Sequence, residues 1–455
     1  MKKQLKLFGY TLGVCLAMIA CEIKDMEHVS EIDAEKFINN GIIKSYNNAM
    51  VLTWNEALSV AVDNQMPPAV EARTYAMVTL AVHDALNNVI PKYETYALDN
   101  SGVNAKEVSR KNIYSIANAA VAQAAHDALV ALVPASAADA GTLLTSSLVE
   151  IEESEFKALG IKIGKEAALS VLDVRKNDPT LRFHEYPQGT EPGQFQSPMP
   201  YAVANPPVWP ANSAYAPDLG SFRPFGIESS SQFRVKPPYL LDSPKYTADY
   251  NEVKILGSNT STERTAEQAD MGMFFLDNVS NLTNRIARIM AVQEKLDGWE
   301  TARLMAVTQM TQFDALLSSF EAMYHYNRWR PVTAIKYGDT DGNDDTTGDP
   351  TWSILQTGRP TPPTPTYPST HAEMGSAGAE IFKLFFKKDN KPFTIGSYSL
   401  PAKERSFSSF SQFATECSLS RIYVGYQFRN DLVEGEKMGR VLAEFVYTNN
   451  LRELK

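Results

Sequence analysis

Apolar side chains recur every three or four residues along most of this chain, the spacing that gathers them on one face of a helix. Residues 70–90 and 113–133 show the pattern clearly, and each predicted helix ends before a following proline. Two more helices are expected within residues 138–178. Strand signals are few, so the pattern predicts an all-α fold, a helical bundle.

The second half of the chain continues in the same way. Long apolar-periodic stretches fill residues 265–320, and helices are expected again at residues 371–386 and 420–447. The loop between them, residues 337–367, is rich in Gly, Asp, Thr and Pro. We expect a single helical domain over residues 51–450.

One segment departs from helical patterning. Twelve of the 26 prolines lie between residues 187 and 244, a density that no long regular element tolerates. Trp209, Tyr215, Phe222 and Phe225 are interspersed there, whereas a disordered linker would be depleted of aromatic residues. We interpret residues 187–244 as a long, irregular, proline-rich cover over the helices.

The N-terminus has the features of a targeting signal. Three lysines within the first six residues precede an apolar run, and Cys21 follows Ala20 at the end of that run. The run is shorter than the ~20 residues that a bilayer requires of a spanning helix. We expect residues 1–20 to be a signal peptide, Cys21 to be the lipid attachment site and residues 21–50 to be a tether.

These features predict an exported lipoprotein of the outer membrane or periplasm, with the cell surface as one location. Its membrane contact would be the N-terminal lipid only, and cleavage without a lipid is the alternative. Of three cysteines, Cys417 alone lies in the body of the chain, so we expect stability to come from a large core and not from disulfides. The formal charge of -10 argues against nucleic-acid binding, although a local pocket can still be positive.

The sequence Ala-x-His-Asp-Ala-Leu occurs twice, around His83–Asp84 and around His126–Asp127. Such a repeat suggests either a metal site or two buried histidines that are satisfied by hydrogen bonds between helices. We prefer the second interpretation.

The acidic loop at residues 339–349 resembles a calcium-binding loop in composition. Its twelfth position is Pro350, where such loops carry a bidentate glutamate. The sequence therefore favours a solvated turn, with calcium binding as the alternative, and no metal bound directly by protein ligands is expected elsewhere.

Three separated segments carry groups suited to a small anion: residues 324–331, 367–372 and 420–431. Arg330 and Arg421 can each donate two parallel hydrogen bonds to an oxyanion. Ser369 can donate its hydroxyl, and the helix expected to start at His371 adds backbone N–H groups and a favourable dipole. His371 is also suited to acid–base chemistry near neutral pH.

In this order, Arg-Pro, then Pro-Ser-x-His, then Ser-Arg-x-x-x-Gly-x-x-x-x-x-Asp, the chain resembles vanadium-dependent haloperoxidases and the related type-2 phosphatidic acid phosphatases. The resemblance extends from about residue 54 to about residue 446. It implies a pocket for phosphate or vanadate, with small oxyanions as the ligand class, and it leaves a homodimer open.

By this resemblance, Arg330, Ser369, Arg421 and the N–H of Thr370 would bind the oxyanion. His371 would be the acid–base residue. Asp431 matches the acid that orients the nucleophilic histidine of the family.

Two positions depart from the family pattern. The expected lysine, seven residues before Arg330, is Met323, and the histidine that attacks phosphorus or ligates vanadium is Gln427. An amide is neither a nucleophile nor a normal vanadium ligand. We expect Gln427 and Asp431, four residues apart, to share a helical face. The same helical spacing predicts that Arg328 and His325 point away from Arg330 and cannot replace the lysine.

Three hypotheses follow. The chain is an enzyme of this class with altered residues, a degenerate relative that binds an anion, or a catalytically inactive surface lipoprotein whose proline-rich cover binds another partner. In the first two hypotheses the pocket is the functional site, whereas in the third it is vestigial and its arginines pair with carboxylates such as Asp431.

Overall fold

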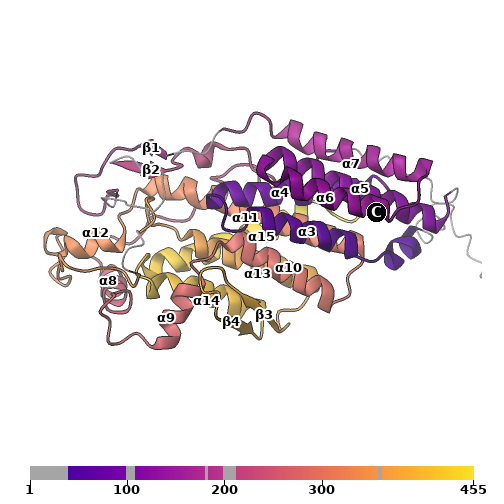
Figure 1. The fold of residues 1–455 in the computed structure, drawn as a ribbon. Coiled ribbons are helices and arrows are strands. Elements are labelled where there is room, and N and C mark those ends of the chain that lie inside the picture. The colour runs from indigo at the N-terminus through magenta and orange to yellow at the C-terminus, as the bar shows by residue number, and fades with distance from the viewer. Residues whose placement is uncertain (1–38, 99–107, 180–182, 198–211, 357–360, 455) are drawn as a thin grey trace, which may run out of the picture.

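The protein is described by a computed structural model over residues 39–98, 108–179, 183–197, 212–356 and 361–454. Helices dominate it (Figure 1). The helices are α3 (Ala49–Val62), α4 (Pro68–Asn87), α5 (Arg110–Leu132), α6 (Ala137–Val149), α7 (Glu155–Val174), α8 (Pro244–Leu256), α9 (Ala266–Phe274), α10 (Val279–Gln293), α11 (Gly298–Tyr326), α12 (Pro331–Lys336), α13 (Thr370–Phe386), α14 (Phe410–Tyr423) and α15 (Arg429–Asn449).

Short elements complete the fold. Strand β1 (Phe183–Glu185) pairs antiparallel with β2 (Ser213–Tyr215), and β3 (Phe393–Gly396) pairs antiparallel with β4 (Glu404–Phe407). Three single turns of 3₁₀-helix lie at Pro134–Ser136, Leu219–Ser221 and Gly338–Thr340. The described part of the chain is therefore mostly helical, which confirms the predicted fold class.

Helix α11 is the centre of the bundle. Every residue from 301 to 320 is buried, as expected of a helix that is covered on all sides, and α11 packs against α4, α10 and α13. A reciprocal cap starts it: the Asp297 carboxylate accepts from the Glu300 N–H at 2.8 Å, and the Glu300 carboxylate accepts from the Asp297 N–H at 3.1 Å. It ends at Asn327, which adopts a left-handed conformation with φ of 49°.

Two glycines of α15 let this helix approach the start of α13 closely. A Cβ atom at Gly435 would lie 2.6 Å from the carbonyl oxygen of Ser369, and one at Gly439 would lie 2.1 Å from that of Glu373. Real Cβ atoms do not approach so closely, so this contact needs glycine. The close packing holds the N-termini of α13 and α15 next to each other.

The proline-rich cover is ordered in its described parts. Leu219, Phe222 and Phe225 are buried in the main core, and the 3₁₀ turn Leu219–Ser221 packs on α11. The carboxylate of Asp314 on α11 accepts hydrogen bonds from three successive backbone N–H groups of the cover, those of residues 225–227, at 2.6 to 3.0 Å. These contacts confirm a cover over the helices for the described residues; residues 198–211 lie outside them.

Most helix predictions are confirmed, and one is wrong. The helix expected at 420–447 is two helices, α14 and α15, because the chain turns at Gly425, whose φ of +84° suits glycine. The hairpin of β3 and β4 also went unpredicted. The packed chain begins earlier than the expected domain start at residue 51, since Ile42 and Ile43 already lie in the core.

The predicted signal peptide, Cys21 and the first part of the tether lie outside the described residues. Within the described residues, no helix combines the length and apolar character needed to cross a bilayer.

Candidate functional site

Backbone and side-chain hydrogen bonds bring the three predicted segments together. Arg330 precedes α12, Ser369 precedes α13, and Arg421 lies in the last turn of α14. The Ser369 N–H donates to the carbonyl of Asp431 at 2.9 Å, and the Ser369 hydroxyl donates to Oε1 of Gln427 at 2.6 Å. The start of α13 is thus fixed directly to the turn before α15, at Gln427, and to the first turn of α15, at Asp431.

Arg330 is 3% exposed and holds two loops against each other. Its Nε donates to the carbonyl of Thr364 at 2.8 Å, and its Nη2 donates to the Thr364 hydroxyl at 2.6 Å. Its Nη1 donates to the carbonyl of Tyr426 at 3.1 Å. One guanidinium therefore joins the loop before α13 to the turn after α14.

Arg421 is 2% exposed and makes its hydrogen bonds to neutral groups. Its Nε donates to the Ser420 hydroxyl at 3.0 Å and its Nη2 donates to the carbonyl of Phe275 at 2.5 Å. Burial lowers its pKa to about 10, so the group stays charged at neutral pH. No carboxylate of the described chain lies within ion-pair distance of it, which leaves a buried positive charge without a negative partner.

His371, in the first turn of α13, lies within electrostatic range of both arginines. Burial lowers the pKa of its imidazole well below the usual value, and the positive charges of Arg421 and Arg330 lower it further. The carbonyl groups of Asp277 and Phe275 oppose this shift. Nε2 of the ring is buried and has no hydrogen-bond partner among the described groups.

The first amides of α13 belong to the same helical turn as His371. Ser369 caps this helix, because its hydroxyl oxygen accepts from the Ala372 N–H at 3.2 Å. The N–H groups of Thr370 and His371 precede the first intrahelical hydrogen bonds and have no acceptor within the helix. The Ser369 hydroxyl hydrogen, which we expected to donate to an anion, is directed to Gln427 instead.

The expected face shared by Gln427 and Asp431 does not exist. Helix α15 begins only at Arg429, so Gln427 precedes it and the four-residue spacing carries no helical meaning there. Both side chains instead bind Thr366: Gln427 Nε2 donates to its carbonyl at 2.9 Å, and Asp431 Oδ2 accepts from its hydroxyl at 2.7 Å. Burial raises the pKa of Asp431 to about 7.

Met323 lies at the edge of this cluster. It is 2% exposed, and its sulfur accepts a weak hydrogen bond from the Thr370 hydroxyl at 3.8 Å. The helical argument that linked Met323 to Arg330 was wrong, because α11 ends at Tyr326 and the left-handed Asn327 turns the chain. Met323 nevertheless contacts the first residue of α13.

The same break in the helix overturns the spacing argument for Arg328 and His325. Arg328 donates to the carbonyl of Tyr239 at 3.1 Å, and its guanidinium lies 5.0 Å from the centre of the Tyr246 ring. His325 is exposed, with its ring against that of Tyr326. Neither residue has a described contact with Met323, the position of the expected lysine.

The repeated His–Asp pairs have two different environments. His83 is fully buried with Nε2 3.0 Å from the carbonyl of Glu94, and burial lowers its pKa to about 4. The Asp84 carboxylate accepts from the backbone N–H groups of residues 96–98. His126 is partly exposed and contacts its neighbour Asp127 at 2.7 Å. The predicted hydrogen bonds between helices were therefore wrong in detail.

In the acidic loop, the carboxylates bind the loop itself. Asp341 accepts from the Thr346 hydroxyl at 2.8 Å, Asp339 accepts from the Gly348 N–H at 2.8 Å, and Asp349 accepts from the Thr351 N–H at 2.9 Å. Across the described ranges, no three His, Cys, Asp or Glu side chains gather in a way that could hold a metal ion.

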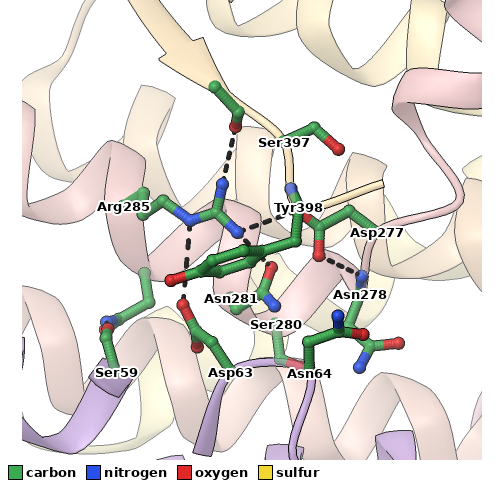
Figure 2. A network of polar contacts seen from close by, with 12 residues as sticks. Ser59, Asp63, Asn64, Asp277, Asn278, Ser280, Asn281, Arg285, Ser397 and Tyr398 are labelled. Carbon is green, nitrogen blue, oxygen red and sulfur yellow. Dashed lines mark hydrogen bonds and ion pairs between the residues drawn. The ribbon is translucent and has the colours of Figure 1, made fainter. Parts of the chain in front are cut away.

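A buried polar network between α3, α4 and α10 was not predicted. Figure 2 shows Arg285 against the ring of Tyr398, between Asp63 and Asp277. Arg285 Nη2 donates to Asp277 Oδ2 at 2.8 Å, and its Nε lies 3.9 Å from Asp63. The Glu71 carboxylate accepts from the Asn278 side chain at 2.9 Å. Spacing along the chain gave no signal for it, because Asp63 and Glu71 lie more than 200 residues before Asp277 and Arg285.

The network adjoins the oxyanion candidates through the segment 275–278. The carboxylate of Asp277 accepts from the N–H groups of Asn278 and Tyr398, both at 2.9 Å, as well as from Arg285. The carbonyls of the same segment face Arg421 and His371. The network therefore fixes the backbone that orients both pocket residues.

Comparison with known proteins finds similarity over most of the chain. Residues 303–454 match the family described as the VCPO second helical-bundle domain. Vanadium chloroperoxidase from Curvularia inaequalis is 24% identical over 461 residues, which cover 80% of this chain and 74% of that protein.

Two solved structures are similar in fold. The crystal structure of the first bacterial vanadium-dependent iodoperoxidase superposes with a TM-score of 0.71 and 22% identity, covering 90% of this chain and 98% of the other. The holo-type bacterial vanadium-dependent chloroperoxidase has a TM-score of 0.66 and 18% identity, covering 84% and 92%. The likeness extends over nearly all of both relatives.

Glu71 makes the stability of the buried network around Arg285 depend on pH. Burial raises the pKa of its carboxyl to about 8, so the folded protein holds this proton more tightly than the unfolded chain does. The stability that the protonated Glu71 carboxyl contributes is complete below the pKa that this carboxyl has in the unfolded chain. It is lost as the pH rises from there to the folded-state pKa of about 8. Glu71→Gln keeps every hydrogen-bond position, since the amide oxygen can accept from Asn64 and Asn278 and the amide N–H can donate to Ser280.

Between pH of about 5 and 9, we expect the wild-type free energy of unfolding to fall by roughly 3 kcal/mol more than that of Glu71→Gln. Urea unfolding at both pH values measures the difference. The exposed Glu263→Gln variant is the control and should follow the wild type. Equal losses in wild type and Glu71→Gln would contradict this assignment.

Proposed function

We propose that this protein, as a member of the vanadium haloperoxidase superfamily, binds a small tetrahedral oxyanion. Phosphate would be the occupant, and the protein would form no covalent bond to it. The binding groups would be Arg421, Arg330 and the first amides of α13, beside His371. The observation that carries this proposal is the buried charge of Arg421, which lacks a carboxylate partner within the described chain.

A buried guanidinium without a counter-charge is costly, and an anion bound beside it offsets that cost. Arg421 meets only the neutral oxygens of Ser420 and Phe275. His371, which lies within electrostatic range of Arg421, adds a buried ring nitrogen, Nε2, with no described partner. A buried charge without a counter-ion and a ring nitrogen without a described partner, near a helix N-terminus, favour an oxyanion ligand over a vestigial, self-paired site.

Vanadate is the cofactor that the family implies, and the residues here do not fit its usual mode of binding. The position of the ligating histidine is taken by Gln427, whose Oε1 accepts from Ser369 and whose Nε2 donates to Thr366. Both ends of this amide are engaged, and neither supplies an imidazole nitrogen. A loosely held oxyanion remains compatible with the arginines and the α13 amides.

The same substitution bears on catalysis. The covalent route needs a nucleophile that accepts the phosphoryl group, and an amide at 427 cannot serve as one. Asp431 has no imidazole to orient and instead binds the Thr366 hydroxyl and the Phe428 N–H, at 2.7 and 2.8 Å. His371 would then act as a ligand-contacting group and not as half of an acid–base pair.

We also propose export and anchoring through a lipid on Cys21, on the strength of the basic start, the apolar run and the position of this cysteine. Metabolic labelling with a radioactive fatty acid in a bacterial host checks this. The wild type should take up label and Cys21→Ser should not, while Cys417→Ser should label normally. Equal labelling of Cys21→Ser and the wild type would overturn the anchor.

Titration calorimetry with inorganic phosphate tests the binding proposal. Wild-type protein should bind phosphate, and Arg421→Gln should weaken binding at least about tenfold, or about 1.4 kcal/mol. Arg440→Gln removes an equal charge from an exposed position and should bind as the wild type does. Circular dichroism establishes that each variant is folded.

Bound phosphate should also raise the thermal midpoint of the wild type, because a ligand specific for the folded state stabilises it. The absence of both heat and thermal shift with the wild type would sink the proposal. Phosphate binding that Arg421→Gln leaves unchanged would place the ligand elsewhere.

A further inference from the structure

The loop at residues 361–367 lies against one of the arginines of the proposed oxyanion site. Nε of Arg330 donates to the carbonyl of Thr364 at 2.8 Å, and Nη2 of the same guanidinium donates to the Thr364 hydroxyl at 2.6 Å. Nε and Nη2 form the edge of a guanidinium that can donate two parallel hydrogen bonds to the two oxygens of one anion. Thr364 therefore binds Arg330 at the edge that an oxyanion would use.

Neighbouring donors of the site are also engaged by protein groups. Nη1 of Arg330 donates to the carbonyl of Tyr426 at 3.1 Å. The Ser369 hydroxyl donates to Oε1 of Gln427 at 2.6 Å, and Nε2 of Gln427 donates to the carbonyl of Thr366, in the same loop, at 2.9 Å. The arrangement is thus a closed one, in which the loop and the turn before α15 accept hydrogen bonds that a ligand would accept.

The proline-rich cover holds the loop in this position. The carbonyl of Pro363 accepts from the N–H of Tyr215 in β2 at 3.0 Å, and the Tyr367 hydroxyl donates to the carbonyl of Lys236. Tyr215 and Lys236 both belong to the cover. Because these two contacts lie on either side of residue 364 along the chain, they keep its carbonyl and hydroxyl at the guanidinium.

An anion can displace these hydrogen bonds. Thr364 offers Arg330 a neutral carbonyl and a neutral hydroxyl, whereas two phosphate oxygens fit the same edge and carry negative charge. Opposite charges attract strongly in a buried site, where water screens them little. The guanidinium therefore binds the anion more strongly than it binds Thr364, but the two existing hydrogen bonds must break first.

We propose that Thr364 is an autoinhibitory contact, which occupies Nε and Nη2 of Arg330 in place of the oxyanion and has to leave them before the ligand can bind there. This inference rests on the proposed oxyanion site and concerns its regulation. The apparent affinity for phosphate is lowered by the cost of releasing Thr364. Since the 361–367 loop is bound to the cover, the cover sets how readily the site opens.

Thr364→Val tests this contact, because it removes the hydroxyl and keeps the shape of the side chain. Nη2 of Arg330 loses that acceptor, so the variant should bind phosphate at least about threefold more tightly than the wild type does. Titration calorimetry of the full-length protein with inorganic phosphate measures both dissociation constants. Thr364→Ser keeps a hydroxyl and should bind as the wild type does. Thr394→Val makes the same change at an exposed position and should also leave the affinity unchanged.

The thermal midpoint of unfolding gives a second readout. Without phosphate, Thr364→Val should unfold at a lower temperature than the wild type, because a buried donor has lost its acceptor. Saturating phosphate should then raise the midpoint of the variant by more than it raises that of the wild type.

Equal phosphate affinity in the wild type and in folded Thr364→Val would overturn the autoinhibitory contact while leaving the oxyanion site standing. Weaker binding by the folded variant would overturn it as well, since Thr364 would then support the bound state. Binding by neither protein would instead remove the proposed function itself.

Discussion

A positive charge buried inside a helical bundle is the constraint on which this site depends. Arg421 donates hydrogen bonds to the carbonyl of Phe275 and the hydroxyl of Ser420, and no carboxylate of the described chain forms an ion pair with it. Interiors tolerate such a group only when partial charges surround it or an anion joins it. The positions of the neighbouring backbone groups must therefore be fixed, both the carbonyls of 275–278 and the amides of α13. The close α13–α15 packing at Gly435 and the network around Arg285 do this.

The two departures from the family pattern have been absorbed by local contacts. Gln427 binds Ser369 on one side and Thr366 on the other, so the amide joins the loop before α13 to the turn before α15. The sulfur of Met323 accepts a weak hydrogen bond from the Thr370 hydroxyl. Each substituted side chain thus has a described partner at the start of α13. The rest of the cluster, Arg330 with its three hydrogen bonds included, keeps an arrangement that suits an anion.

The sequence predicted the long helices because their apolar spacing is a local property. It also pointed to Arg330, Ser369, His371 and Arg421, since their motifs are short and each sits beside a helix end. The hydrogen bonds between those segments could not be derived in this way. Thr364 and Thr366, which bind Arg330, Gln427 and Asp431, are ordinary residues in a polar loop until the chain folds.

Helical spacing failed where backbone conformation overrode it. The left-handed Asn327 and the glycine at 425 each end a helix inside a stretch that reads as continuous, and the arguments about shared faces failed with them. The network of Asp63, Glu71 and Arg285 joins positions far apart in the chain. Only the fold brings those charges together, so the periodicity of the sequence could not predict this network.

The most direct test of this account restores the two missing residues. Vanadate is titrated into wild-type protein and into the Met323→Lys, Gln427→His double variant, with Arg440→Gln as a folded control. If the pocket is otherwise intact, the double variant should bind vanadate at least about tenfold more tightly than the wild type. A folded double variant with no gain in affinity would contradict the claim that these side chains surround one oxyanion site.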